Sequence, residues 1–158
     1  MKHFMTVDPG LDFGIAKWKE GELWPEVVEV FVHSKTKNKT DWFPRAQESY
    51  VEFREHLLCE PEPSKVYFEW PDFFANASTR RGDQGKLQML IGMMVGACLE
   101  LDLEVELVNV RDWKGNLPKH VVEAQVKRIL TPRFCARNGI KTHAYDAVGI
   151  GLYLKGEL

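Results

Sequence analysis

The chain has 158 residues, 44% of them hydrophobic and 28% charged, which fits one globular domain spanning residues 1–158. Its formal net charge of −2 gives no global basic field that would indicate nucleic-acid binding. Its three cysteines have no CxxC spacing, which argues against a zinc site or a disulfide framework, and its longest apolar run, 11 residues, is too short to cross a bilayer. We therefore expect a cytoplasmic protein without a membrane segment.

The first half of the chain predicts four strands and a helix. Alternating apolar residues indicate strands at 3–8, 13–19 and 26–34, with the turn DPGLD between the first two. Three successive strands suggest an antiparallel meander. Pro44 suits the first turn of a helix at 44–58, where apolar residues recur near helical spacing. A fourth strand follows in the short run KVYFEW.

The second half begins with a helix at 86–102 that is apolar on nearly every side, so we expect it to be buried all round. Further elements are predicted as a strand at 103–110, a helix at 117–130 that begins near Pro118, and a helix at 142–156. Thr142 is the expected cap of this last helix and Gly156 its stop. The order predicts an α/β fold with a central five-stranded mixed sheet, its first three strands antiparallel, flanked by helices.

Three acids stand where the hydrophobic pattern would place apolar residues. Asp8 ends the first strand, Glu69 comes near the end of the fourth strand, and Asp146 lies inside the last helix. His143 precedes Asp146 by three residues, about 60° round a helix, so both point to the same side. If the first and fourth strands are parallel neighbours, Asp8 and Glu69 share one edge of the sheet. A final helix packed over that edge would bring Asp146 and His143 to them.

Such a cluster predicts a metal site. Carboxylates brought together raise each other's pKa unless cations neutralise them. Oxygen ligands with one imidazole suit Mg²⁺ or Mn²⁺, and two such ions about 4 Å apart are the usual means of attacking a phosphodiester. Taken singly, each acid could instead cap a turn, pair with a lysine or face solvent, and His143 could be a surface residue at a helix start. The four together favour the metal site.

Four segments, in this order over nearly the whole chain, resemble the RuvC-type Holliday junction resolvases of the RNase H-like nuclease superfamily. TVDPGLDFGIAKW resembles the family's opening strand-turn-strand, VYFEW its second acidic strand, and HAYDAVGIGLYL its closing helix. VRDWKGNLPKHVVEAQVKRIL resembles the lysine-containing loop and the helix that follows it. The short length and divergent middle look more like a phage-encoded member than a typical bacterial one.

The resemblance implies an RNase H-like fold and a Mg²⁺-dependent endonuclease that resolves four-way DNA junctions by paired symmetric nicks, leaving 5′-phosphate and 3′-hydroxyl ends. It implies two Mg²⁺ ions per site, replaceable by Mn²⁺, with the metal ligands Asp8, Glu69, His143 and Asp146. It also implies an assisting lysine near the phosphate, Lys114 or Lys119, of which we favour Lys119. A homodimer would be built partly on the apolar helix at 86–101. A phage-encoded member would act in the host cytoplasm.

Family members are often basic, whereas this chain is slightly acidic, so binding of branched DNA would rest on local charge. Basic side chains gather in three places: Lys35, Lys37 and Lys39; Arg80, Arg81 and Lys86; Lys114 and Lys119. In the family an aromatic residue in the loop after the second acid lies against bases at the crossover. Phe73 or Phe74 matches that residue; the alternative is that one of them is packed in the core.

Other functions compete with junction resolution. The sequence does not distinguish a junction resolvase from a relative with the same fold that cuts forks, flaps or RNA–DNA hybrids. An actin-like or sugar-kinase-like nucleotide-binding protein also begins its phosphate loop with Asp-x-Gly between two strands. Such proteins need two of these domains, and 158 residues supply one. A DNA-binding protein without activity is disfavoured, because carboxylates repel phosphate unless a metal intervenes.

Overall fold

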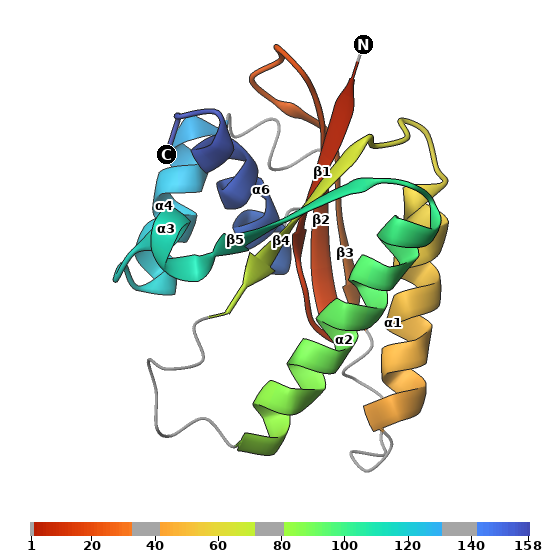
Figure 1. Cartoon of the computed structure of the whole chain (residues 1–158). Coiled ribbons are helices and arrows are strands. Elements are labelled where there is room, and N and C mark those ends of the chain that lie inside the picture. The colour runs from red at the N-terminus through yellow and green to blue at the C-terminus, as the bar shows by residue number, and fades with distance from the viewer. Residues whose placement is uncertain (1, 33–41, 72–80, 131–141) are drawn as a thin grey trace.

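The computed structural model describes residues 2–32, 42–71, 81–130 and 142–158. Within these ranges the strands form a five-stranded sheet of order β3-β2-β1-β4-β5 (Figure 1). The strands are β1 (His3–Asp8), β2 (Asp12–Lys19), β3 (Pro25–Val32), β4 (Lys65–Trp70) and β5 (Glu104–Asn109). The first three strands are antiparallel, whereas β4 runs parallel to both β1 and β5. The predicted α/β fold with a mixed sheet is confirmed.

Helices cover both faces of the sheet (Figure 1). One layer consists of α1 (Trp42–Leu57) and α2 (Arg81–Glu100); the other consists of α3 (Val110–Lys114), α4 (Lys119–Ile129) and α6 (Thr142–Leu154). Successive side chains of a strand point to opposite faces. Met5 and Val7 of β1 therefore pack in the cluster with α1 and α2, whereas Phe4 and Thr6 face α6. This alternation decides which layer each polar side chain of a strand meets.

Several element boundaries differ from the predictions. The helix expected from residue 44 starts at Trp42, and the helix expected from residue 86 starts at Arg81. The strand expected to reach residue 110 ends at Asn109, because the next five residues form the unpredicted helix α3. Pro118 is the N-cap of α4 rather than part of it. Gly156, with φ of 73°, follows the end of α6 as expected. The side chain of Thr142 lies outside the described residues.

Helix α2 is not buried all round, so this prediction is wrong. Leu90 and Met94 are buried in the cluster with the sheet, but Met89 is 47% exposed and Leu99 is 63% exposed. One stripe of α2 packs on the chain's own core, and the opposite stripe faces outward because no other described element covers it. None of the helices in the described ranges is both long and apolar enough to span a bilayer.

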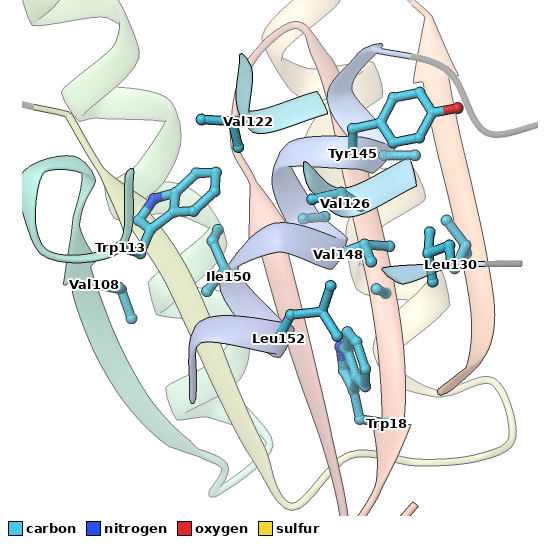
Figure 2. Close-up of a cluster of buried hydrophobic side chains, with 14 residues drawn as sticks. Trp18, Val108, Trp113, Val122, Val126, Leu130, Tyr145, Val148, Ile150 and Leu152 are labelled. Carbon is cyan, nitrogen blue, oxygen red and sulfur yellow. The ribbon is translucent and has the colours of Figure 1, made fainter. Parts of the chain in front are cut away.

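A buried hydrogen-bond network holds α6 on the sheet. The Thr6 hydroxyl donates to the carbonyl of Ala147 at 2.7 Å and accepts a hydrogen bond from Nε1 of Trp18 at 3.0 Å. Figure 2 shows Trp18 among the buried side chains packed around this helix. A buried polar group is stabilising only when it is paired, and Thr6 satisfies two partners at once. The network fixes α6 at the residue next to Asp146.

Two glycines let α6 approach the sheet closely. A Cβ on Gly14 of β2 would lie 2.3 Å from the carbonyl oxygen of His143, and a Cβ on Gly151 of α6 would lie 2.1 Å from the Trp18 ring. Glycine within a strand often marks such a close backbone approach. Because Gly14 touches the first turn of α6, it sets the distance between that turn and the sheet.

Candidate active site

The three acids converge at one edge of the sheet. Asp8 is at the end of β1 and Glu69 near the end of the parallel neighbour β4, where Val7 pairs with Phe68 one residue earlier. Because Val7 and Phe68 both face α1 and α2, Asp8 and Glu69 both point to the α6 side. Asp146 projects from α6 toward this edge and is 2% exposed. The arrangement that the sequence predicted for the acids is therefore present.

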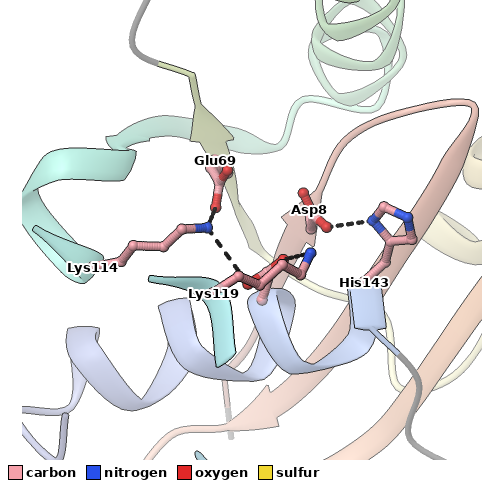
Figure 3. A network of polar contacts seen from close by, with 6 residues as sticks. Asp8, Glu69, Lys114, Lys119 and His143 are labelled. Carbon is pink, nitrogen blue, oxygen red and sulfur yellow. Dashed lines mark hydrogen bonds and ion pairs between the residues drawn. The ribbon is translucent and has the colours of Figure 1, made fainter. Parts of the chain in front are cut away.

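Asp8 contacts His143 directly. Nδ1 of His143, from the first turn of α6, lies 2.7 Å from Oδ2 of Asp8 (Figure 3). The hydrogen bond to Asp8 raises the pKa of His143, because the protonated ring donates to a carboxylate. The Asp8 side chain is buried, whereas the His143 side chain is 36% exposed. His143 thus reaches the cluster from its solvent side.

Two lysines lie among the carboxylates (Figure 3). The Lys114 ammonium at the end of α3 is 3.7 Å from Oε2 of Glu69 and 3.5 Å from Oδ1 of Asp146. Lys119, at the start of α4, donates to Oδ2 of Asp146 at 2.6 Å. Lys114 therefore bridges the acids of β4 and α6, and Lys119 pairs with only one of them. Both lysines suggested by the sequence belong to this cluster.

The pKa values show a cluster short of positive charge. Burial raises the pKa of Asp8, which Asp146 raises further and the hydrogen bond from His143 lowers. Burial, with a contribution from Asp8, raises the pKa of Glu69 to about 7 despite the nearby Lys114. Burial lowers the pKa of Lys119, but its hydrogen bond to Asp146 and the negative charges of Asp146, Asp8 and Glu123 together outweigh this effect, and the net shift is upward. An additional cation would relieve the repulsion that favours protonation of these acids.

The donor set fits a hard divalent cation. Oε2 of Glu69 and Oδ1 of Asp146 are buried and have no hydrogen-bond partner. Carboxylate oxygens are the ligands that Mg²⁺ prefers. In the part of the chain that is described, no three Asp, Glu, His or Cys side chains are grouped closely enough to hold one ion. The Lys114 and Lys119 ammonium groups balance part of the carboxylate charge.

The predicted DNA-contacting residues are placed only in part. Phe73, Phe74, Arg80 and the lysines at 35, 37 and 39 lie outside the described residues, and so does the side chain of Arg81. Lys86 is exposed on the first turns of α2, 3.9 Å from Asp83.

Sequence reasoning missed the residues that hold the acids in place. Thr6, Gly14 and Trp113 attach α6 to the sheet or lie beside the acids, yet none carries a charge. Two features of the sequence could have indicated them: a glycine within a strand pattern and a threonine in an apolar run. Each predicts a close contact but does not say which residue makes it.

No protein-family model matches this sequence, and no curated protein matches it. The structure of T. thermophilus RuvC in complex with Holliday junction substrate is similar with a TM-score of 0.67 and 19% identity, over 98% of this chain and 96% of that one. The chain has the RuvC fold. A second Thermus thermophilus RuvC structure is similar at a TM-score of 0.61 and 20% identity, over 95% of this chain and 91% of that one.

The RuvC fold confirms the RNase H-like fold class that the sequence motifs implied, and it extends over nearly the whole chain. The acids at the ends of β1 and β4 and on α6 therefore occupy the carboxyl edge of parallel strands in a RuvC fold. Open α/β sheets bind their ligands at this edge.

Proposed function

We propose that this chain is a metal-dependent nuclease that cuts four-way DNA junctions. The observation that carries the proposal is the convergence of Asp8, Glu69 and Asp146, all largely buried, at one edge of the sheet in a RuvC fold. The similar RuvC in complex with Holliday junction substrate supports a junction as the substrate. Grouped buried carboxylates weaken a fold on their own, so a role that needs their charge explains their presence.

Asp8, Glu69 and Asp146, with His143, would hold two Mg²⁺ ions, for which Mn²⁺ can substitute. When bound, the ions supply an activated water and stabilise the leaving 3′-oxygen, which gives 5′-phosphate and 3′-hydroxyl ends. The chain's own residues orient the ligands: Lys114, 17% exposed, holds Glu69 and Asp146 together from within the cluster. Lys119 is 44% exposed, so it is the more accessible of the two lysines for a phosphate at the surface.

Paired symmetric nicks need two active sites, and we propose a homodimer built on the outward stripe of α2. Met89 and Leu99 expose large apolar surfaces there. A Cβ added at Gly92 or Gly96 of the same helix would meet no neighbouring atom within 4 Å, so a second backbone has room to approach. Branched DNA would then be contacted by Lys86 and Lys114, together with Phe73, Phe74, Arg80 and Arg81. The phage origin and the host cytoplasm stay predictions.

Purified protein with Mg²⁺ should introduce symmetric nicks in a synthetic four-way junction and leave linear duplex intact. The expected mass in solution is about twice the 18.2 kDa of one chain, measured by light scattering on the same sample. A replication fork, a flap and an RNA–DNA hybrid serve as parallel substrates. Faster cutting of one of these would favour the alternative substrate class, and no cutting of any of them would contradict the nuclease proposal.

Metal binding should oppose the pH dependence that stability has without metal. The pKa of Glu69 rises from an ordinary value of 4.5 to about 7, so the folded protein binds more protons than the unfolded chain between these values. Without metal, stability should therefore fall as pH rises through this window, and the raised pKa values of Asp8 and His143 act in the same direction. Mg²⁺ needs deprotonated ligands, so its stabilising effect should grow with pH.

Thermal unfolding at about pH 5 and about pH 8, with and without Mg²⁺, measures both effects. The Tm increase on adding Mg²⁺ should be larger at the higher pH. In Glu69→Gln, which cannot titrate at this position, both the metal-free pH dependence and the Mg²⁺ effect should shrink. Equal Tm increases at the two pH values would contradict the assignment of the acids as metal ligands.

A further inference from the structure

Trp113 lies between the acid of β4 and the helix that carries Asp146. It belongs to α3, which begins directly after β5, and in the β4–β5 pair Glu69 is opposite Val108. Trp113 is 5% exposed, and Figure 2 shows its indole beside α6. A Cβ on Gly149 of α6, three residues after Asp146, would lie 2.6 Å from Cζ3 of this ring. The absence of a side chain at Gly149 therefore makes room for the indole at the site.

Trp113 and Glu69 each carry a buried polar atom that makes no hydrogen bond, although that of Glu69 forms an ion pair with Lys114. Nε1 of Trp113 is buried and makes no hydrogen bond of ordinary geometry, and the same holds for Oε2 of Glu69. The indole N–H is nevertheless near enough to Glu69 to lower the pKa of that carboxyl, against the larger effect of burial. The Lys114 ammonium lies 4.8 Å from the ring centroid. One side chain thus meets both residues at the β4 end of the cluster.

If Trp113 only packed in the core, its unpaired indole N–H would have no explanation. Buried indole N–H groups normally find an acceptor, as Trp18 does by donating to Thr6 at 3.0 Å. Leaving a donor buried and unpaired is costly, and replacing it by an apolar group of the same shape is often neutral or stabilising. The unpaired donor therefore indicates a hydrogen bond that completes in the working state of the site, with the adjacent Glu69 carboxylate as its acceptor.

We propose that Trp113 is a positioning residue for Glu69: its N–H donates to the carboxylate and holds it in the orientation that presents the other oxygen to a divalent ion. This inference rests on the proposed function, because it gives Glu69 the role of metal ligand. The Trp113 ring also makes a cation–π contact with Lys114, the lysine that pairs with Glu69. Partners that orient a metal ligand in this way typically contribute about 10–100-fold to metal affinity.

The test compares Trp113→Phe with Trp42→Phe, since each replaces one indole by a phenyl ring and Trp42 packs in the cluster with α1 and α2. Mg²⁺ affinity is measured by titration calorimetry, and stability by thermal unfolding without metal. Trp113→Phe should bind Mg²⁺ about tenfold more weakly. Its Tm should fall only by what the lost ring volume in the core costs, because no hydrogen bond of ordinary geometry is broken. Trp42→Phe should keep its Mg²⁺ affinity, because Trp42 packs with α1 and α2 on the face of the sheet away from the acids.

A Kd for Mg²⁺ within about twofold of wild type in Trp113→Phe would overturn the positioning role, since an orienting partner contributes more than this. An equal weakening in Trp42→Phe would also overturn it, because the effect would then follow from loss of packing. Failure of the proposed function looks different: the wild-type protein would take up Mg²⁺ and cut no branched DNA. In that case the two Kd values still decide whether Trp113 orients Glu69.

Discussion

Asp146→Asn should cut a four-way junction about a thousandfold more slowly than the wild-type protein while still binding it. Asp146 is 2% exposed and is the acid that both Lys114 and Lys119 contact. Asparagine keeps the shape but removes the charge that a divalent ion needs. A catalytic metal supplies several kcal/mol of transition-state stabilisation, and each 1.36 kcal/mol corresponds to a factor of ten in rate. The rate is measured on a labelled junction under single-turnover conditions.

Binding of the junction is measured separately by gel shift without divalent metal. We expect the affinity of Asp146→Asn to be equal or higher, because one negative charge near the phosphates is lost. Asp102→Asn is the matched control, because it makes the same chemical change at an exposed residue between α2 and β5. Asp102 has a φ of 57°, a conformation that asparagine also tolerates. The control should cut at the wild-type rate. Wild-type cutting by Asp146→Asn would show that Asp146 is not a metal ligand.

Gly14→Ala should destabilise the fold and also impair the site. The added Cβ would lie 2.3 Å from the carbonyl oxygen of His143, 2.4 Å from its carbonyl carbon and 2.8 Å from the amide nitrogen of Ala144. These are backbone atoms of the first turn of α6, so no side-chain rotation can relieve the clash. The turn must move away from β2, which would lengthen the 2.7 Å contact between His143 and Asp8. Overpacking of this kind costs about 1–3 kcal/mol.

Stability is measured by thermal unfolding, where each kcal/mol corresponds to about 2–4 °C for a chain of this size. Junction cleavage should fall by about a hundredfold, since displacing a catalytic group by about 1 Å has effects of this order. Gly85→Ala is the control, because its Cβ would meet no atom within 4 Å on α2 and alanine favours a helix. It should be as stable as the wild type or more so. A wild-type Tm in Gly14→Ala would contradict the close approach of α6.

Much of the fold was predictable because it depends on local patterns. The strands β1 and β4 have the bounds that alternation and turn residues indicated, and β2 begins one residue earlier than predicted. The short helix α3 was missed because five residues are too few for a helical period to appear. The exposed stripe of α2 was missed for another reason: an apolar helix looks the same in sequence whether its second face meets the core or faces outward.

The order of residues along β1 and β4 was enough to determine which side of the sheet each acid faces, because side chains alternate strictly along a strand. Asp8 and Glu69 each follow one residue after the paired Val7 and Phe68, so they face the same side. The placement of Lys114 between two of the acids, and the meeting of Trp113 with Glu69, came from the three-dimensional packing alone. The same is true of how closely α6 sits on β2. These contacts join residues far apart in the chain, and their geometry follows from the packing of whole elements, which no local pattern records.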